Sequence, residues 1–254
     1  LRVPLAMAAD CAELAKDVTM GIVFSRGPAV DGRQVDRQCQ EINVEGHGVI
    51  GISSYLAPNS LLVLGQQDTI DRLTERLRSL TGPAIHVRKN PHRWPPLHTP
   101  IVWQRSVPNR ARVMMHTIKG GFHRPTPPIV SLVTGKMSYT EDNCRELIGQ
   151  WIDHPQRLWD AVCATLSAGM RIVIHVGPEP NLIPATFQRL AANVLEQTQG
   201  RSLSSLSLRA VHGIARQAWL RALLPHRAAL LRAPQLLHVI LEDWLLTNAP
   251  TIKK

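Results

Sequence analysis

A histidine flanked by three prolines is the residue of this sequence best suited to chemistry. His98 lies in the stretch Pro95-Pro96-Leu97-His98-Thr99-Pro100. Because proline fixes its φ at about −65° and has no backbone N–H, neither a helix nor a central strand can continue through this stretch. We therefore expect the imidazole to lie on a stiff loop, as the positioning of a general base requires. The alternative is a surface turn that carries one of the 11 histidines of the chain.

Length and charge set bounds on the partners of such a residue. The chain has 254 residues, which is enough for one large domain or two modest ones with a sizeable core. Its 29 basic and 19 acidic residues give a net charge of +10, which favours anionic partners. The basic residues are scattered and aromatic residues make up only 4% of the chain, whereas nucleic-acid modules cluster basic residues beside stacking aromatics. We therefore predict no nucleic-acid partner.

The cysteines and the hydropathy pattern predict a soluble cytoplasmic protein. The four cysteines are Cys11, Cys39, Cys144 and Cys163. They form no Cys-x-x-Cys pair and show no zinc-type spacing with histidine, so we expect reduced, mostly buried thiols and neither a metal nor a cofactor. No apolar run approaches the length of a membrane span, and the chain begins without a signal-peptide pattern.

The first third of the chain has the pattern of a ferredoxin-like unit. After an alanine-rich helix over 5–16, apolar runs and Gly/Pro breaks predict strands at 18–24, 49–55, 61–64 and 84–87, with helices after Asp31 and after Asp68. The order over about 18–88 is β-α-β-β-α-β. RNA-recognition modules share this order, but they need aromatic residues on the central strands. The two corresponding segments hold a single aromatic residue, Phe24, which argues against RNA binding.

The rest of the chain alternates strands and helices, which indicates an α/β layer. The patterns predict a helix over 101–118 interrupted by Pro108, a short strand at 129–133, helices over 140–151 and 155–168, a buried parallel strand over 171–176 and a helix to Gln197. A linker at 199–202 precedes an Arg/Leu-rich helical region. Helices that cover a core face explain that composition better than a helix lying on a membrane surface.

Five segments carry a family resemblance. They are Tyr55-Leu56-Ala57-Pro58-Asn59-Ser60 with Leu61-Leu62-Val63-Leu64-Gly65, then Leu97-His98-Thr99-Pro100, then Pro128-Ile129-Val130-Ser131, then Leu147-Ile148-Gly149-Gln150 followed by Pro155 and Trp159, and finally His175-Val176-Gly177-Pro178 followed by Leu182. In order and spacing, over about residues 18–190, they resemble the malonyl-CoA:acyl carrier protein transacylases and the acyltransferase domains of polyketide synthases.

The resemblance implies a fold and site residues. The fold is α/β: a ferredoxin-like (βαββαβ) small subdomain over 18–90, the C-terminal part of an α/β-hydrolase-like acyltransferase body over 91–198, and a helical extension over 199–254. His98 stands where the family has its catalytic base, and Gln150 where it has a residue that helps to hold the nucleophile and oxyanion region. The resemblance also places Ser54 and Ser131 among the substrate-binding residues.

The implied activity is transfer of a malonyl or related acyl group from CoA to acyl carrier protein, of the acyl-carrier-protein S-malonyltransferase type, in fatty acid or polyketide synthesis. The implied partners are malonyl-CoA or another acyl-CoA and the carrier protein, and the net positive charge suits both because both are anionic. The alternative is a non-catalytic acyltransferase-like scaffold that binds carrier protein or other partners.

One departure from the family pattern affects the expected activity. The family's nucleophile lies in a Gly-His-Ser-x-Gly elbow at a strand-to-helix turn, and this sequence has none. Ser25 lacks the first glycine, and Ser54 falls in a predicted strand. The chain begins at Leu1 without a methionine, which favours a nucleophile segment upstream over a degenerate homologue. We therefore expect this chain alone to be inactive.

The arginine that holds the malonyl carboxylate in the family is also absent from this sequence, so the acyl specificity stays open.

Overall fold

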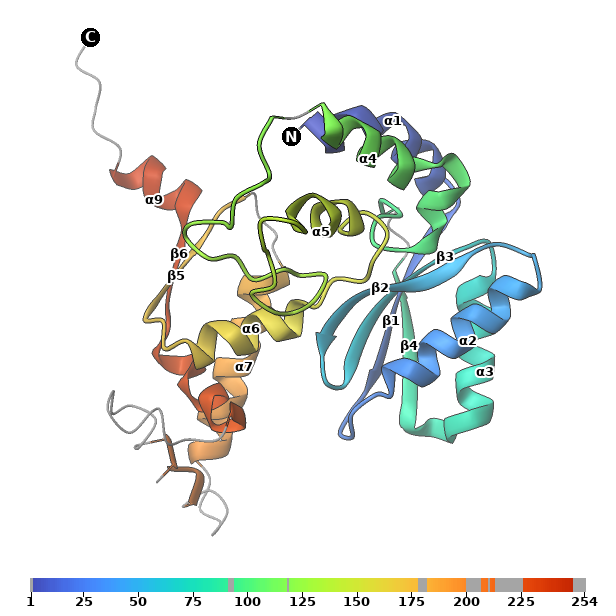
Figure 1. Cartoon of the computed structure of the whole chain (residues 1–254). Helices are drawn as coiled ribbons and strands as arrows, with labels where there is room; N and C mark the ends of the chain where they lie inside the picture. Colours follow the sequence, from blue (N-terminus) through green and yellow to red (C-terminus); the bar gives the residue numbers. More distant parts are fainter. Residues whose placement is uncertain are drawn as a thin grey trace. The chain divides into compact units, whose positions relative to one another are not determined.

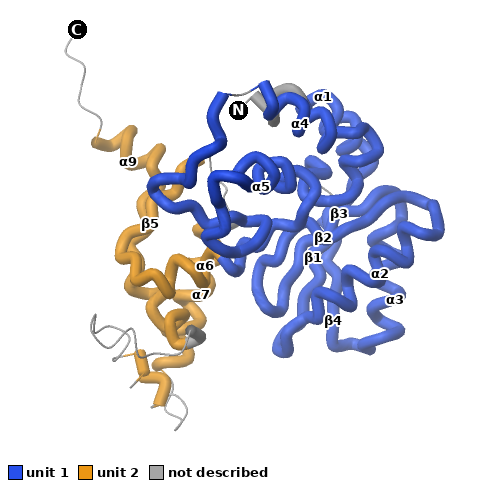
Figure 2. Tube along the Cα trace, in the orientation of Figure 1, with its two compact units in different colours: residues 1–160 blue, residues 161–254 orange. Residues whose placement is uncertain are grey.

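The computed structural model describes residues 2–90, 94–117, 119–177, 182–199, 207–209, 211–212 and 226–248. The chain divides into two compact units, residues 1–160 and residues 161–254 (Figure 2). Each unit is described by itself. Among the described helices, none combines the length and the apolar character needed to cross a membrane.

A four-stranded sheet forms the centre of the first unit (Figure 1). Its elements are β1 (Val18–Ser25), α2 (Gly32–Val44), β2 (Ile50–Ala57), β3 (Ser60–Gln66), α3 (Thr69–Thr81), a short 3₁₀ turn η1 (Gly82–Ala84) and β4 (Ile85–Asn90). The strand order is β2-β3-β1-β4, and every neighbouring pair is antiparallel. The element order predicted from the sequence is therefore confirmed, together with the antiparallel pairing.

Both faces of this sheet are covered by apolar side chains. On one face α2 and α3 pack Val35, Ile42 and Leu73, all fully buried, against the strands. On the other face Leu64 packs with Leu14 of the first helix. Burial of each such side chain contributes about 1.5–3 kcal/mol relative to exposure. Two covered faces explain why β3 is a continuous apolar run rather than an alternating one.

With the exception of α1, the remaining helices of the first unit are shorter than the sequence patterns predicted. They are α1 (Arg2–Ala15), the 3₁₀ helix η2 (Pro100–Arg105), α4 (Val107–His116), α5 (Cys144–Gln150) and α6 (Leu158–Ser167), which continues into the second unit. The helix predicted over 101–118 is divided at Ser106, whose φ of 51° is left-handed, and Pro108 lies in the first turn of α4. Proline is compatible with that turn because the first N–H groups of a helix have no partner within it.

The prediction of a short strand at 129–133 is wrong. The segment forms a turn in which the Ser131 N–H donates to the Lys136 carbonyl at 2.8 Å, and only this one bridge forms. The chain reverses immediately at Gly135, whose φ is 72°. A left-handed turn this close to Ser131 leaves no length of extended chain for a strand.

The second unit contains a small parallel sheet. Its described elements after α6 are β5 (Ile172–His175), α7 (Leu182–Gln199), the 3₁₀ helix η4 (His226–Gln235), β6 (Leu237–Ile240) and α9 (Leu241–Asn248). β5 pairs with β6 in parallel. The prediction of parallel pairing is confirmed, but that of a buried strand is wrong, because Ile172 and Ile174 are 55% and 58% exposed. Within the described residues β5 has a single neighbouring strand, and its inward face is occupied by the buried His175.

The helical region predicted after residue 199 is partly confirmed. η4 and α9 are helical, whereas the strand β6 was not expected. The remainder of that prediction falls on 200–206, 210, 213–225 and 249–254, which lie outside the described residues.

One glycine of β2 allows the proline-flanked loop to approach the sheet. A Cβ at Gly51 would lie 2.5 Å from Cδ of Pro100 and 3.6 Å from Cβ of Thr99. We expect Gly51→Ala to lower the free energy of unfolding by about 1–3 kcal/mol, because the loop or the strand must shift. Gly27→Ala is the matched control, since a Cβ at Gly27 meets nothing within 4 Å. Urea denaturation measures both variants, and equal midpoints would contradict the close approach.

Candidate functional site

The backbone at His98 is held in an uncommon conformation. Its φ is 68°, in the left-handed region that residues other than glycine rarely adopt. Such a residue costs about 1–3 kcal/mol and persists only when its surroundings fix it. The His98 N–H donates to the Ile152 carbonyl at 2.7 Å, and Thr99 Oγ1 donates to the Pro96 carbonyl at 2.6 Å. Backbone strain of this kind clusters at functional sites. The φ of His98 therefore supports the prediction that this loop positions a general base.

The imidazole of His98 is oriented as a base. Its Nδ1 lies 2.6 Å from the Trp151 carbonyl oxygen. Because a carbonyl can only accept, Nδ1 carries the proton and Nε2 of the neutral ring keeps its lone pair. The ring also meets the indole of Trp151 edge-on, with centroids 4.7 Å apart and planes at 77°. This packing fixes the plane of the imidazole as well as its tautomer.

The pKa of His98 is lower than the ordinary value of 6.5. Burial is the larger cause, because it disfavours the imidazolium, and the hydrogen bond to the Trp151 carbonyl opposes it. The ring is therefore neutral at neutral pH, which is the form that accepts a proton.

The loop is attached to the free edge of the sheet. β2 is an edge strand, and Ser53 Oγ donates to the Leu97 carbonyl at 3.3 Å. The outer edge of β2 pairs with the segment after α5: Gln156 N–H donates to the Ser53 carbonyl and Tyr55 N–H to the Gln156 carbonyl, both at 2.8 Å. These bonds cover the edge and tie the residues that hold His98 to a rigid element.

Ser54 and Ser131, predicted to bind substrate, lie on neighbouring segments. Ser54 is bridged to Gln156, and Arg157 N–H donates to the Leu132 carbonyl at 2.7 Å, beside Ser131. Both serines are buried, with exposed fractions of 4% and 1%. The Oγ of Ser131 is buried without a hydrogen-bond partner, which is uncommon for a hydroxyl and costs free energy.

Gln150, the second predicted catalytic residue, ends α5. It is half-buried, and its Nε2 donates to Glu146 Oε1 at 3.0 Å. No hydrogen bond to His98 is found for it among the described residues, but it directly precedes Trp151 and Ile152, the two residues whose carbonyls hold His98.

Gln156 is a site residue that the sequence patterns did not indicate. It is 3% exposed, and its Nε2 donates to the His154 carbonyl at 2.9 Å while lying 3.5 Å from the Trp151 carbonyl oxygen. That oxygen also accepts the hydrogen bond of His98 Nδ1. The Oε1 of Gln156 is buried without a partner. A polar residue between proline and arginine has the sequence signature of an exposed turn, so no pattern distinguished it.

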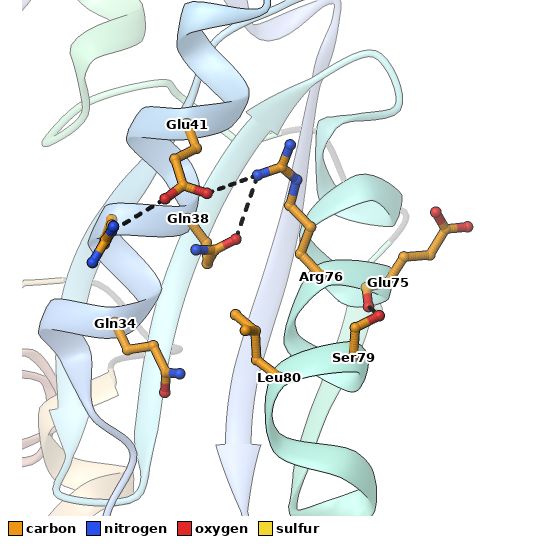
Figure 3. A pocket seen from close by; sticks show the side chains of 8 residues that line it. Gln34, Gln38, Glu41, Glu75, Arg76, Ser79 and Leu80 are labelled. Carbon is orange, nitrogen blue, oxygen red and sulfur yellow. Dashed lines mark hydrogen bonds and ion pairs between the residues drawn. The ribbon is translucent and has the colours of Figure 1, made fainter.

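A groove lies between α2 and α3 (Figure 3). It has a volume of about 670 Å³. Its basic residues are paired: Arg76 with Glu41 at 3.0 Å and with Glu45, and Arg37 with Glu41 at 3.2 Å. Because these carboxylates neutralise the cations, the groove offers no site for a phosphate. Within the described ranges, no cluster of three His, Cys, Asp or Glu side chains could hold a metal ion.

The base lacks a visible nucleophile. In the part of the chain that is described, no hydroxyl or thiol makes a hydrogen bond with His98 Nε2. Ser53 donates to Leu97, and Ser25 donates to the Pro28 carbonyl at the far end of β1. The arrangement therefore supplies an oriented base and buried polar groups.

Comparison with known proteins identifies the fold. No family model matches the sequence, and no curated protein matches it. Among solved structures, the malonyl-CoA:acyl carrier protein transacylase from Streptococcus pneumoniae aligns with a TM-score of 0.58 and 17% identity over 74% of this chain and 57% of that one. The corresponding enzyme from Xanthomonas oryzae pv. oryzae gives 0.56 and 19% over 74% and 55%.

A type II polyketide synthase malonyl-transacylase, solved in complex with its acyl-carrier protein, gives a TM-score of 0.53 and 16% identity over 71% of this chain and 56% of that one. This chain thus spans about half the length of the solved chains that it matches. The resemblance inferred from the sequence is confirmed at the level of fold: the chain has a mixed α/β structure whose described part follows the fold of malonyl-CoA:acyl carrier protein transacylases.

Proposed function

We propose that this chain is the base-bearing part of an acyltransferase that moves a malonyl or related acyl group from CoA to acyl carrier protein. The observation that carries the proposal is the hydrogen bond from His98 Nδ1 to the Trp151 carbonyl, which leaves Nε2 free to accept a proton. The motif Leu97-His98-Thr99-Pro100 and the transacylase fold support it.

The proposal includes the finer architecture. Residues 18–90 are the ferredoxin-like small subdomain, supported by the strand order β2-β3-β1-β4. Residues 91–198 are the C-terminal part of an α/β-hydrolase-like body, and residues 199–254 are an extension. The net charge of +10 suits CoA phosphates and an acidic carrier protein.

The chemistry requires a hydroxyl nucleophile from a Gly-His-Ser-x-Gly elbow. The serine oxygen attacks the thioester carbonyl while its proton passes to His98 Nε2. The C–S bond then breaks, and the imidazolium returns the proton to the departing CoA thiolate. In the second half-reaction, the carrier thiol gives its proton to His98 Nε2 and its sulfur forms the new C–S bond with the acyl carbonyl carbon. The ester C–O bond breaks, and the serine oxygen recovers the proton.

The other site residues have supporting roles in this proposal. The amide of Gln150 helps to hold the nucleophile and the oxyanion, and the buried hydroxyl of Ser131 and the neighbouring Ser54 contact the substrate. Gln156 is a positioning residue, because it shares the Trp151 carbonyl with His98. The unpaired Oγ of Ser131 and Oε1 of Gln156 are available to a bound group without breaking an existing hydrogen bond.

The decisive test is acyl transfer by a polypeptide that carries both this chain and a Gly-His-Ser-x-Gly segment, sought first in the reading frame upstream of Leu1. That polypeptide should transfer the acyl group from CoA to carrier protein. His98→Asn should lower kcat by about 10²–10⁴-fold, the usual contribution of a general base. Asparagine is the matched change because it tolerates the left-handed conformation and can donate to Trp151. Full activity of His98→Asn would refute the role of His98 as the base, whereas carrier-protein binding without transfer would favour the non-catalytic scaffold.

The chain alone should not become acylated. A nucleophile and its base act as a unit, so the absence of the nucleophile removes nearly all covalent catalysis. Incubation with radiolabelled malonyl-CoA, followed by denaturing electrophoresis, should show no protein-bound label. Stable label that disappears in Ser25→Ala or Ser54→Ala would show that the nucleophile lies within this chain.

The depressed pKa of His98 predicts a pH-dependent stability. The native state holds the ring neutral, whereas the unfolded chain protonates it near the ordinary value of 6.5. The unfolded state therefore binds more protons as the pH falls below that value, and folding loses stability. We expect the free energy of unfolding to fall more between pH 7 and pH 5 in the wild type than in His98→Asn. Equal losses in the two proteins, measured by urea denaturation, would contradict a buried neutral His98.

A further inference from the structure

An apolar pocket opens beside the loop that carries His98. Its volume is about 470 Å³. An engineered protein cavity of about 150 Å³ already binds benzene, so this volume accommodates a hydrocarbon chain. The described side chains that line it carry no charge, and they include Met7, Cys11, Ala12, Trp94, Leu97 and Trp151.

The floor of the pocket is part of the core, and its rim is open. Met7 and Cys11 are buried in an apolar cluster against which Leu97 and Trp151 pack. On the rim, Ala12 of α1 is exposed and Trp94 is 40% exposed. Ligand pockets of proteins have this construction: a preformed apolar hollow of about 300–1,000 Å³.

Two of the lining residues also position the base. Leu97 directly precedes His98, and the indole of Trp151 meets the imidazole edge-on at 4.7 Å. A group that fills the pocket therefore contacts the same indole as His98. This juxtaposition places the pocket beside the residues that hold the proposed base.

We propose that this pocket holds the hydrocarbon chain of an acyl thioester, so that the substrate is an unbranched acyl group with a hydrocarbon chain rather than malonyl. The assignment rests on the proposed acyltransferase function. A malonyl carboxylate in the pocket would meet no cation among its described lining residues, and an unpaired buried charge is strongly disfavoured. Arg110, the basic side chain whose charge acts on Cys11, is already paired with Asp10.

The chain offers a matched pair of variants. Ala12 lines the pocket and is exposed, so Ala12→Trp fills the hollow without displacing a core residue. Ala9 is also an exposed residue of α1, but it is not part of the pocket lining. Ala9→Trp therefore controls for the effect of a tryptophan on α1, and thermal unfolding checks that both variants fold.

The experiment measures binding of acetyl, butanoyl, hexanoyl, octanoyl and malonyl N-acetylcysteamine thioesters to the 254-residue chain by calorimetry. Each methylene should strengthen binding about fourfold up to octanoyl, as expected for burial of a CH₂ group. The malonyl thioester should bind no tighter than the acetyl thioester. Ala12→Trp should abolish the dependence on chain length, and Ala9→Trp should preserve it.

Equal affinities across the series, tighter binding of the malonyl thioester, or identical behaviour of the two variants would overturn the assignment. The measurement involves neither CoA, carrier protein nor catalysis. Chain-length-dependent binding without acyl transfer in the joined polypeptide would refute the proposed function and leave the hydrocarbon pocket standing. Acyl transfer with a flat binding series would refute the pocket alone.

Discussion

The carbonyl oxygen of Trp151 is the atom on which the arrangement of the site depends. It accepts the hydrogen bond of His98 Nδ1, it lies within reach of Gln156 Nε2, and it belongs to the C-cap residue of α5. Because carbonyls at a helix end lack partners within the helix, this oxygen is available to the loop. One unsatisfied group of secondary structure thus sets both the tautomer and the orientation of the proposed base.

The strained loop can persist because it is held at several points. The left-handed backbone conformation at His98 is stabilised by the hydrogen bond to Ile152 and by a hydrogen bond within the loop. The close contact of Pro100 with Gly51 of β2 also holds the loop in place. Each neutral hydrogen bond contributes only about 0.5–1.5 kcal/mol, so several of them are needed to offset the upper part of a strain of about 1–3 kcal/mol. The edge of β2 therefore has a positional role, in that it holds the loop and the segment around Gln156 in one frame.

Sequence patterns predicted the parts of this structure that depend on local order. The βαββαβ unit follows from apolar runs bounded by glycine and proline, and Asp31 caps α2 as its side chain suggested. The patterns failed where the outcome depends on partners distant in sequence. Segment 129–133 is mostly apolar and partly β-branched, yet it forms no strand, and β5 has the composition of a buried strand, yet Ile172 and Ile174 are exposed. His98 was found because prolines mark it, whereas Gln156 was missed because its burial comes from pairing with β2.

Trp151 contacts both the proposed base and the apolar pocket. Its backbone fixes the base, and its indole forms one wall of the apolar pocket while also meeting the imidazole ring. A hydrocarbon chain that fills the pocket excludes water from the Trp151 indole. This lowers the local polarity and strengthens the burial that already depresses the pKa of His98. In the proposed enzyme, occupation of the pocket and the neutral state of the base are thus favoured by the same desolvation.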